Sequence, residues 1–514
     1  MMTEMDGGNH NRLKSTPWLW IPTLYFAEGI PYFIVNVISV IMFKRLGMGN
    51  GDIAMYTGLL YLPWVIKPLW SPFVDIIRTK RWWVVTMQVL MSSAFAAAAF
   101  SIPGQASLSD FIRTAAMPSE AASGVSQASA PVSLFVLTLV IFWITAFASA
   151  THDIAADGFY MLALDKGEQS FFVGIRSTFY RLSSVFGQGV LVVAAGLLET
   201  RLENIPLAWS LTLLACALLF AALTFYHIFV LPRPVSDAPA VAENKDCELQ
   251  KTPSGGNHVR QCLHSRRDGG SLEMASDGCG GAGSRTDEYI FSGIVREFGK
   301  TFATFFRKRH VWMAIVFMLL YRLPEAFLVK MLNPFLLDPV SEGGLGLSTE
   351  TVGIVYGTAG VIALTLGGIV GGMAASRWGL KRSMWPMALS LALPCLVFLY
   401  LAVAQPSDIW IISSCVVFDQ FGYGFGFTAY MLYMMYFAEG EFKTSHYSIC
   451  TAFMALSMML PGMVAGYLQE WLGYVGFFWM VAVCCMATVG VTLFVKVDPE
   501  YGVRKAVHDD GTEK

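Results

Sequence analysis

Two aspartates one helical turn apart close a long apolar run in the first half of the chain. The segment ATHDIAADGFY, residues 150–160, places Asp153 and Asp157 four positions apart, directly after SLFVLTLVIFWITAFASA. This spacing puts both carboxylates on one face of a helix. A charged side chain inside a bilayer-spanning helix is costly and marks an ion or substrate path. We therefore expect the pair to face a protein interior or a water-filled path rather than lipid.

Other ionisable residues occur within equally apolar stretches. The further acids are Glu28, Glu325 and Asp419, and the bases are Lys67, Arg176, Arg181, Arg322 and Lys330. Such a balanced set predicts mutual neutralisation, which lowers the cost of burial. A carboxylate with a movable basic partner can also bind a proton on one side of a membrane and release it on the other, because desolvation and the cation act in opposite directions. The pattern therefore fits proton-coupled transport.

Glu28 and Glu325 are the leading candidates for proton coupling. Each lies near a proline, Pro31 or Pro324, and proline interrupts the helical hydrogen-bond ladder and frees backbone carbonyls near the acid. For Glu325, a static ion pair with Arg322 at i and i+3 is an equally good interpretation.

Lys67 and Arg181 are cations well inside apolar segments. In a transporter of anionic peptides or sugar acids they would pair with substrate carboxylates, the arginine through its bidentate fork. Their alternative role is countercharge to the buried acids.

The elements that position these residues must be membrane-spanning helices. Of 514 residues, 55% are hydrophobic and only 14% are charged, whereas a soluble chain carries about a quarter charged residues. Apolar windows of about 20 residues recur, enough to cross roughly 30 Å of hydrocarbon. We predict an all-α polytopic membrane protein with about twelve spans. They lie near residues 18–43, 53–74, 82–102, 132–161, 172–197, 207–231, 311–336, 350–375, 384–404, 409–437, 446–468 and 474–496.

Basic residues set the expected orientation. One set of alternate loops carries about 26 Lys and Arg and the other about four, namely Lys44, Arg45, Arg113 and Arg201. The positive-inside rule makes the first set cytoplasmic, and an even number of spans then places both termini in the cytoplasm. The first span is followed by no signal-peptide cleavage pattern, so we expect it to remain as an uncleaved helix.

A polar central segment divides the chain into two halves. Residues 232–287, rich in Gly, Ser and charge, predict a disordered cytoplasmic linker. Residues 288–310 predict an amphipathic helix on the inner leaflet, with a plain polar lead-in to the seventh span as the alternative. The remaining predicted regions are a cytoplasmic N-terminus (1–17), an N-terminal six-helix bundle (18–231), a C-terminal six-helix bundle (311–497) and a cytoplasmic tail (498–514).

Short basic turns recur at equivalent positions of the two halves. SPFVDIIRTKRW (71–82) follows the second span, and GMAASRWGLKRS (372–383) follows the eighth. Such duplication is typical of transporters built from repeats. The two turns resemble the loop motif of the major facilitator superfamily, although Ser71, Arg78 and Ser376 depart from its pattern.

Four longer segments extend the resemblance over most of the chain. KPLWSPFVD (67–75), ATHDIAADGFY (150–160), LYRLPEAF (320–327) and FDQFGYGFGFTAYM (418–431) are similar to helices two, four, seven and ten of AmpG-type muropeptide permeases and the related acetyl-coenzyme A transporters. The resemblance implies a major facilitator fold with two six-helix bundles that import anhydro-muropeptides with protons across the inner membrane. Acetyl-coenzyme A, a peptide or another sugar conjugate is the alternative cargo.

The resemblance also implies an inner gate, since the superfamily commonly braces the basic loop after its second helix with an acid at the end of its fourth. The gate candidates are Asp75, Arg78, Lys80, Asp157, Arg176, Arg377 and Lys381. The candidates for substrate binding or proton coupling are Glu28, Lys67, Asp153, Arg181, Arg322, Glu325, Asp419 and Gln420.

Two other classes fit the sequence less well. An intramembrane protease needs two carboxylates that converge on one bond, whereas Asp153 and Asp157 share one helical turn, and the chain has no HExxH zinc motif. A signalling sensor would use the central segment as its output, and that segment predicts no folded unit. We expect no enzymatic activity, cofactor, metal or nucleic-acid partner, and a functional monomer that uses the proton gradient to move a small molecule through the bilayer.

Overall fold

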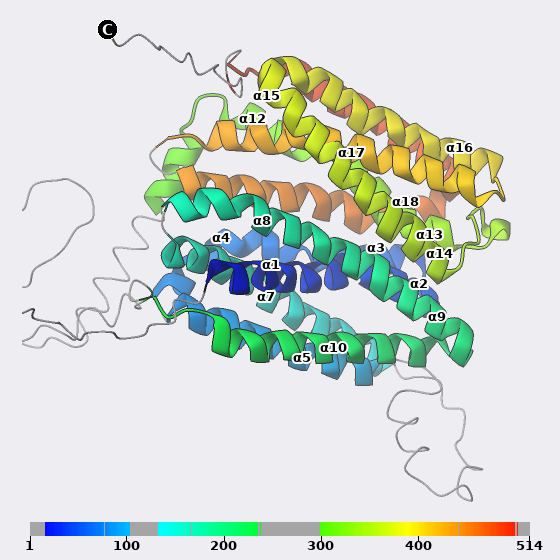
Figure 1. The fold of residues 1–514 in the computed structure, drawn as a ribbon. Coiled ribbons are helices and arrows are strands. Elements are labelled where there is room, and N and C mark those ends of the chain that lie inside the picture. The colour runs from blue at the N-terminus through cyan, green and yellow to red at the C-terminus, as the bar shows by residue number, and fades with distance from the viewer. Residues whose placement is uncertain are drawn as a thin grey trace, which may run out of the picture.

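The structure is a computed structural model that describes residues 16–76, 78–102, 132–164, 166–234, 237, 299–440, 443–498 and 501. Within these residues every regular element is a helix (Figure 1). We call the end of the molecule at which the first helix begins the inner end, and the opposite end the outer end.

The first half consists of six spans, several of them made of consecutive helical segments. They are α1 (Pro17–Phe33), η1 (Ile34–Ile38) and α2 (Ser39–Arg45); α3 (Asn50–Leu59) and α4 (Leu62–Ile76); α5 (Lys80–Ser101); α7 (Val132–Ala163); α8 (Lys166–Val185), η2 (Phe186–Leu191) and α9 (Val192–Leu202); and α10 (Ile205–Val230).

The second half repeats this plan. Its elements are α12 (Val311–Leu320), α13 (Leu323–Leu337), η3 (Val340–Glu342), α14 (Thr349–Val352), η4 (Gly353–Gly360), α15 (Val361–Ala392), η5 (Leu393–Cys395), α16 (Leu396–Ala404), α17 (Ile409–Ala438) and α18 (Lys443–Phe494). Two of these helices fold back on themselves at a glycine. Gly379 in α15 and Gly473 in α18 have φ values of 76° and 66°, a region that favours glycine.

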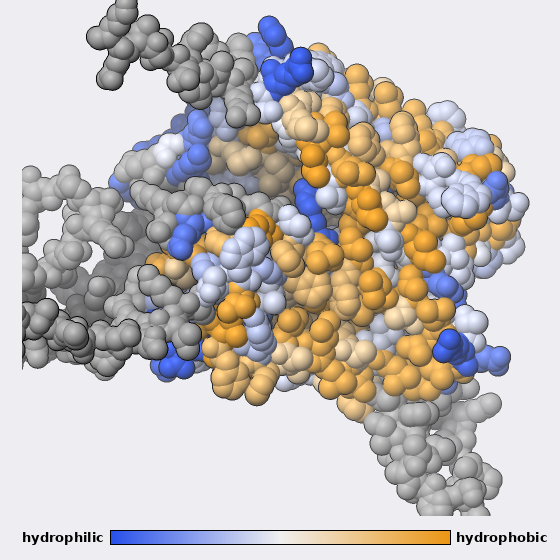
Figure 2. All heavy atoms as spheres, viewed as in Figure 1, coloured by the Kyte–Doolittle hydropathy of each residue, from blue (hydrophilic) through white to orange (hydrophobic). Residues whose placement is uncertain are grey.

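The predicted number of spans is confirmed for the described part of the chain. Eight helical stretches are long and apolar enough to cross a membrane. Two of them contain the folds at Gly379 and Gly473 and therefore cross twice, while α3–α4 and α17 supply the remaining crossings. The observed ends lie within a few residues of most predicted ones. Large apolar side chains such as those of Phe225, Phe229 and Leu493 are exposed on the outside, and Figure 2 shows a broad apolar surface on one face of the molecule.

The two prolines near the candidate acids interrupt their helices in different ways. Pro31 lies inside α1 and is followed by the π-helical segment η1. Pro324 begins α13, and the seventh span is broken just before it, at Tyr321 and Arg322. Both breaks lie beside the predicted acids, as expected for helices that line a cavity.

The predicted tails, most of the central linker and the first part of the predicted interfacial helix lie outside the described residues. Residues 299–306 are helical. Phe305 is fully buried against Phe437 of α17 and Phe453 of α18, with ring centroids 5.6 and 6.3 Å away. This part of the segment therefore packs on the second half of the protein, and its position on a lipid surface stays a prediction.

Candidate functional site

A cavity of about 1500 Å³ lies between the two halves. Helices α1, α4, α7 and α8 form one wall, and α13, α15, α17 and α18 form the other. Its lining extends to the inner end, where Met161, Thr301 and Ser445 border it.

The wall of the first half carries two ion pairs on the acidic face of α7. Lys67 Nζ bonds to Asp153 Oδ2, and Arg176 Nη2 lies 2.8 Å from Asp157 Oδ1. The Tyr25 hydroxyl also donates to Asp157 Oδ1 at 3.3 Å, and the Arg176 guanidinium stacks 4.5 Å from the Tyr25 ring. The i, i+4 spacing thus brings both aspartates to the cavity, each with its own cation.

Glu28 completes this group as a third carboxylate. Oxygen atoms of Glu28, Asp153 and Asp157 lie within 4.8 Å of one another. Glu28 is only 8% exposed, and its Oε2 has no hydrogen-bond partner among the described residues. Because Lys67 and Arg176 neutralise two carboxylates, the group keeps one excess negative charge, which a single proton would neutralise. The two cations make the same cluster a poor metal site, because they already occupy its carboxylates.

The wall of the second half holds a bidentate ion pair, in which one arginine bonds both oxygens of one carboxylate. Arg322 donates from Nε and Nη2 to both oxygens of Glu325, at 2.9 and 2.7 Å. Its Nη2 also donates to the Tyr423 hydroxyl at 2.9 Å, and its guanidinium lies 4.7 Å from the Phe427 ring. Both carboxylate oxygens of Glu325 are therefore satisfied by one bidentate partner, which is the static arrangement considered above.

Arg181 reaches the cavity without a carboxylate partner. Within the described residues it forms no ion pair. The Arg181 side chain instead spans the cavity toward α15, where a Cβ added at Gly368 would lie 3.3 Å from its Nη2. Arg181 can therefore bind an anionic group of a ligand.

Asp419 and Gln420 differ in their access to the cavity. Gln420 is among the residues that line it, whereas Asp419 is buried and is not part of the described lining. Asp419 Oδ2 accepts a hydrogen bond from Gln420 Nε2 at 3.1 Å. The amide of Gln420 is thus the group of this pair that can meet a ligand.

Of the predicted inner-gate residues, Asp157 and Arg176 form an ion pair, and this pair lies in the cavity wall. The Arg78 guanidinium lies 5.8 Å from the Trp82 ring. The Lys80 side chain packs against Gly158 of α7, where an added Cβ would be 2.9 Å from Lys80 Cε.

The gate candidates of the second half are separate from these groups. Arg377 and Lys381 are exposed, and the side chain of Asp75 lies outside the described part of the structure. The physical reason is that the cavity extends to the inner end, so the two halves are apart where an inner gate would close.

A polar layer closes the outer end, and the sequence analysis did not predict it. Lys44 Nζ lies 2.5 Å from Asp338 Oδ1, and the Tyr474 hydroxyl donates to Asp338 Oδ2 at 2.5 Å. Asn50 Nδ2 donates to Gln469 Oε1 at 2.6 Å and to Asp338 Oδ2 at 3.2 Å. Lys44 and Asn50 belong to the first half and the other three residues to the second. We call these five residues the outer polar layer.

Glu199 forms a second connection between the halves at this end. Its carboxylate accepts hydrogen bonds from Arg45 Nε at 3.0 Å, Trp209 Nε1 at 2.8 Å and Thr349 Oγ1 at 2.7 Å. Thr349 begins α14 of the second half. The sequence offered one signal for both connections, since Lys44 and Arg45 are two of the few basic residues predicted for the outer side.

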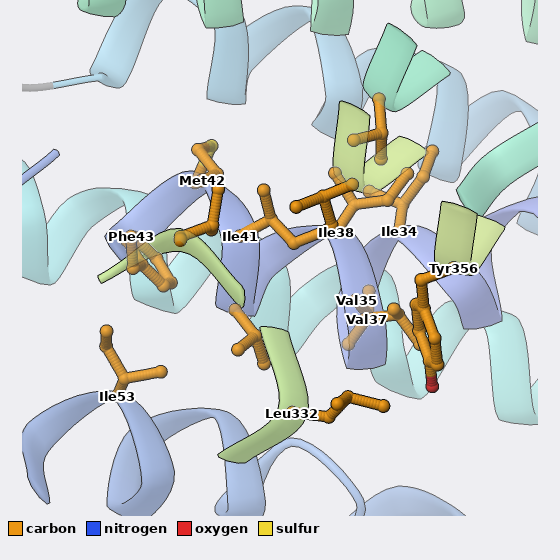
Figure 3. Packing of buried hydrophobic residues seen from close by; sticks show 14 of the residues in the cluster. Ile34, Val35, Val37, Ile38, Ile41, Met42, Phe43, Ile53, Leu332 and Tyr356 are labelled. Carbon is orange, nitrogen blue, oxygen red and sulfur yellow. The ribbon is translucent and has the colours of Figure 1, made fainter. Parts of the chain in front are cut away.

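An apolar plug lies beneath the outer polar layer. Side chains of η1 and α2, including Ile34 and Ile38, pack with Leu332 of α13 and Tyr356 of η4 (Figure 3). Backbones of the halves also touch directly, because a Cβ added at Gly357 would lie 1.8 Å from the Gln188 carbonyl oxygen. The cavity is therefore sealed from the outer end.

Two related six-helix halves around a cavity that is closed at one end are the architecture of an alternating-access membrane transporter. The sequence profile of the Major Facilitator Superfamily matches residues 22–447 of the chain. The protein belongs to this family and is a multi-pass membrane transporter rather than an enzyme.

Curated relatives point to one branch of the family. The chain is 22% identical over 477 residues to the anhydromuropeptide permease of Escherichia coli K12, covering 88% of this chain and 74% of that protein. It is 29% identical over 215 residues to the putative transporter AmpG 2 of Rickettsia felis, covering 40% of this chain and 49% of that protein. The chain thus matches about half the length of this Rickettsia relative.

Solved structures confirm the fold alone. A POT family transporter in complex with 5-aminolevulinic acid aligns with a TM-score of 0.62 at 11% identity, covering 93% of this chain and 96% of that one. The D-xylose-proton symporter aligns with a TM-score of 0.59 at 12% identity, covering 95% and 98%.

Proposed function

We propose that this transporter imports anhydro-muropeptides or related peptidoglycan fragments across the inner membrane, together with protons, for cell-wall recycling. The similarity to the anhydromuropeptide permease and to AmpG transporters supports this cargo. The observation that carries the proton coupling is the unpartnered, buried carboxylate of Glu28 beside two paired aspartates in the cavity wall.

Glu28 is the proton-binding group in this proposal. Each of its neighbours Asp153 and Asp157 has a cation, so a proton on Glu28 brings the group to neutrality. When the cavity faces the outside, Glu28 binds a proton, and when it faces the inside, it releases one. Glu325 is less suited to this role, because Arg322 already bonds both of its oxygens.

The cavity has chemistry that suits a sugar-linked peptide. The free guanidinium of Arg181 binds a substrate carboxylate, and the amide of Gln420 donates to its polar groups. Tyr32, Trp64 and Tyr180 line the cavity and offer faces on which a sugar ring packs. A volume of about 1500 Å³ accommodates a cargo larger than a single sugar or amino acid.

The proposal includes an orientation and an energy source. The inner end, with both termini, faces the cytoplasm, and the proton gradient drives a functional monomer without a bound cofactor. The bias of basic residues supports this orientation.

Uptake of labelled anhydro-muropeptide into proteoliposomes tests the cargo and the coupling together. With an inward proton gradient we expect accumulation above equilibrium, and without the gradient only equilibration. If no labelled compound enters under either condition, the cargo is wrong, and acetyl-coenzyme A, peptides and other sugar conjugates are then tried in the same assay. Equal accumulation with and without the gradient would refute proton coupling.

Replacement of Glu28 by Gln tests the proton site. We expect Glu28→Gln to lower gradient-driven accumulation sharply while substrate exchange across the membrane continues, since the amide fills the same space but binds no proton. Glu342→Gln, the same change at an exposed glutamate of η3, is the matched control and should keep accumulation. Full accumulation by Glu28→Gln would move the proton site elsewhere.

A further inference from the structure

Lys330 is a buried cation that the proposed transport mechanism does not yet use. It lies on α13 of the second half and is only 4% exposed. Its Nζ donates to Thr57 Oγ1 of α3 in the first half, at 2.8 Å. Its stem packs on α18, where a Cβ added at Gly462 would be 3.4 Å from Lys330 Cε. The amine therefore bridges the two halves.

The amine lies between the cavity and the closed outer end. Its neighbours Val329 and Tyr61 both line the cavity, and the Lys330 Nζ is 5.5 Å from the Tyr61 ring. Farther along α13 is Asp338 of the outer polar layer. Opening of the outer end must separate α3 from α13 and α18, and this movement exposes Lys330 to the external solution.

The surroundings of Lys330 hold no countercharge within ion-pair distance among the described residues. The acids nearest in the fold have other partners: Glu325 bonds to Arg322, Asp338 to Lys44, Glu470 to the Gly51 N–H, and Asp52 to Tyr467. The other charged or titratable groups on the elements that pack against α13 are Lys44, Arg45, Tyr56, Glu350, Arg377, Lys381, Arg382, Cys395, Lys443, His446, Tyr447, Cys450, Tyr467, Tyr474, Cys484 and Cys485.

An ammonium group in this position is poorly satisfied. It has three N–H donors, and the Thr57 hydroxyl is the one acceptor it meets within the described residues. The ring of Tyr61 adds a cation–π attraction, which is small beside the cost of removing an unpaired charge from water. A neutral amine meets the same contacts without that cost.

We propose that Lys330 is a proton-carrying latch of the outer closure, which binds a proton when the outer end is open and loses it when the two halves close around it. The inference deepens the proposed function, on which it rests, by giving the transporter a second group that carries a proton inward. On closure the ammonium becomes an amine and one proton, and the proton leaves to the water of the cavity beside Tyr61. The cavity then delivers it to the inner side.

Hydrogen–deuterium exchange of the full-length protein in nanodiscs tests the latch without cargo or gradient. Protection of residues 49–58 and 338–348 reports outer closure, and residues 205–230 serve as an internal reference. After correction for intrinsic rates, we expect the wild-type closed-to-open ratio to rise between pH 5.5 and pH 8.5, by at most about tenfold per pH unit for one titrating group.

Two substitutions of Lys330 should change the protection of the outer segments in opposite directions. Lys330→Met removes the charge at similar length, and should give full protection that is equal at both pH values. Lys330→Arg keeps its proton at both pH values, so the outer segments should stay poorly protected. Lys330→Gln is a second uncharged variant in case the Met protein does not fold.

Two further variants separate the latch from the proton site. Glu28→Gln should keep the wild-type pH response of outer protection, even if the muropeptide assay fails. Thr57→Val keeps Lys330 but removes the hydroxyl that bonds to it. The protection of the outer segments should therefore still rise with pH, but from a lower level. A wild-type pH response in Lys330→Met or Lys330→Gln, or wild-type protection of Lys330→Arg at pH 8.5, would overturn the latch.

Discussion

Glu28 and Glu325 lie on the corresponding first helices of the two halves, yet their environments differ. Arg322 holds Glu325 through two parallel hydrogen bonds, and both side chains are nearly fully buried. Glu28 shares two cations with two other acids and keeps an oxygen without a partner. The same residue type can therefore serve as a fixed structural charge in one half and as a candidate proton carrier in the other.

The Arg322–Glu325 pair gives a stability prediction. Arg322→Met should lower the free energy of unfolding by about 3–5 kcal/mol, because it leaves Glu325 buried without a countercharge. The double substitution Arg322→Met with Glu325→Met should recover most of that loss, since no lone charge remains. Chemical unfolding in detergent measures both. Equal stability of the single variant and the wild type would mean that water reaches Glu325 and solvates it.

Glycines allow the helices of the two halves to meet backbone to backbone at the outer end. In the contact of η2 with η4, Gly357 faces the Gln188 carbonyl, and in the contact of α3 with α18, Gly466 faces the Asn50 carbonyl. An added Cβ would lie 1.8 Å from the oxygen in both places, which backbone cannot accommodate without movement. These two helix pairs are therefore the surfaces that separate when the outer end opens.

Gly357→Leu should prevent closure of the outer end. We expect uptake to fall at least about tenfold, because the state that is closed at the outer end loses population. Residues 338–348 should become less protected from hydrogen exchange at the same time. Gly372→Ala is the matched control, since nothing lies within 4 Å of a Cβ at that position, and it should transport normally. If Gly357→Leu transports at the wild-type rate, the contact of η2 with η4 is not part of the closure.

The molecule as a whole is open at the inner end and closed at the outer end. Its cavity extends to the inner end, while the outer polar layer, Glu199 and the apolar plug join the halves at the outer end. Figure 3 shows residues of the plug. Alternating access requires that the outer contacts break and that contacts form at the inner end. Arg377 and Lys381 are exposed in this state and form no ion pair within the described residues.

The ion pair of Lys44 and Asp338 should control the balance between the two states. Reversing one charge, as in Lys44→Asp, removes the ion pair with Asp338 and puts two like charges on facing segments, so it should shift the protein toward the state that is open at the outer end, with loss of uptake. The exchanged double variant, Lys44→Asp with Asp338→Lys, should regain part of the uptake. Uptake in proteoliposomes at matched protein levels measures both variants. A double variant no better than the single one would assign the effect to Asn50 and Tyr474 instead.

The fold could be predicted from the sequence because each membrane span produces a local pattern of apolar residues. Apolar windows of bilayer length give the spans, and Gly379 and Gly473 mark the short inner and outer turns that join neighbouring helices. The spacing of Asp153 and Asp157 also predicted correctly that both would face one cavity wall.

The ion pairs and hydrogen bonds between side chains could not be predicted from the sequence, because they depend on which helices become neighbours. Asp157 had several basic residues available, and packing of α1, α7 and α8 selected Arg176. Asp338, Asn50 and Gln469 lie far apart in the chain and resemble ordinary polar residues near helix ends, so no local signal pointed to the outer polar layer.

By itself the sequence determined that this is a twelve-span transporter of two related halves with acids and bases inside its spans, since length, hydropathy and spacing are properties of single helices. Only the tertiary structure decided which charges neutralise one another, which carboxylate and which lysine lack a countercharge, and which end is closed. Those properties arise from contacts between helices of different halves, where burial removes water and makes each missing partner costly.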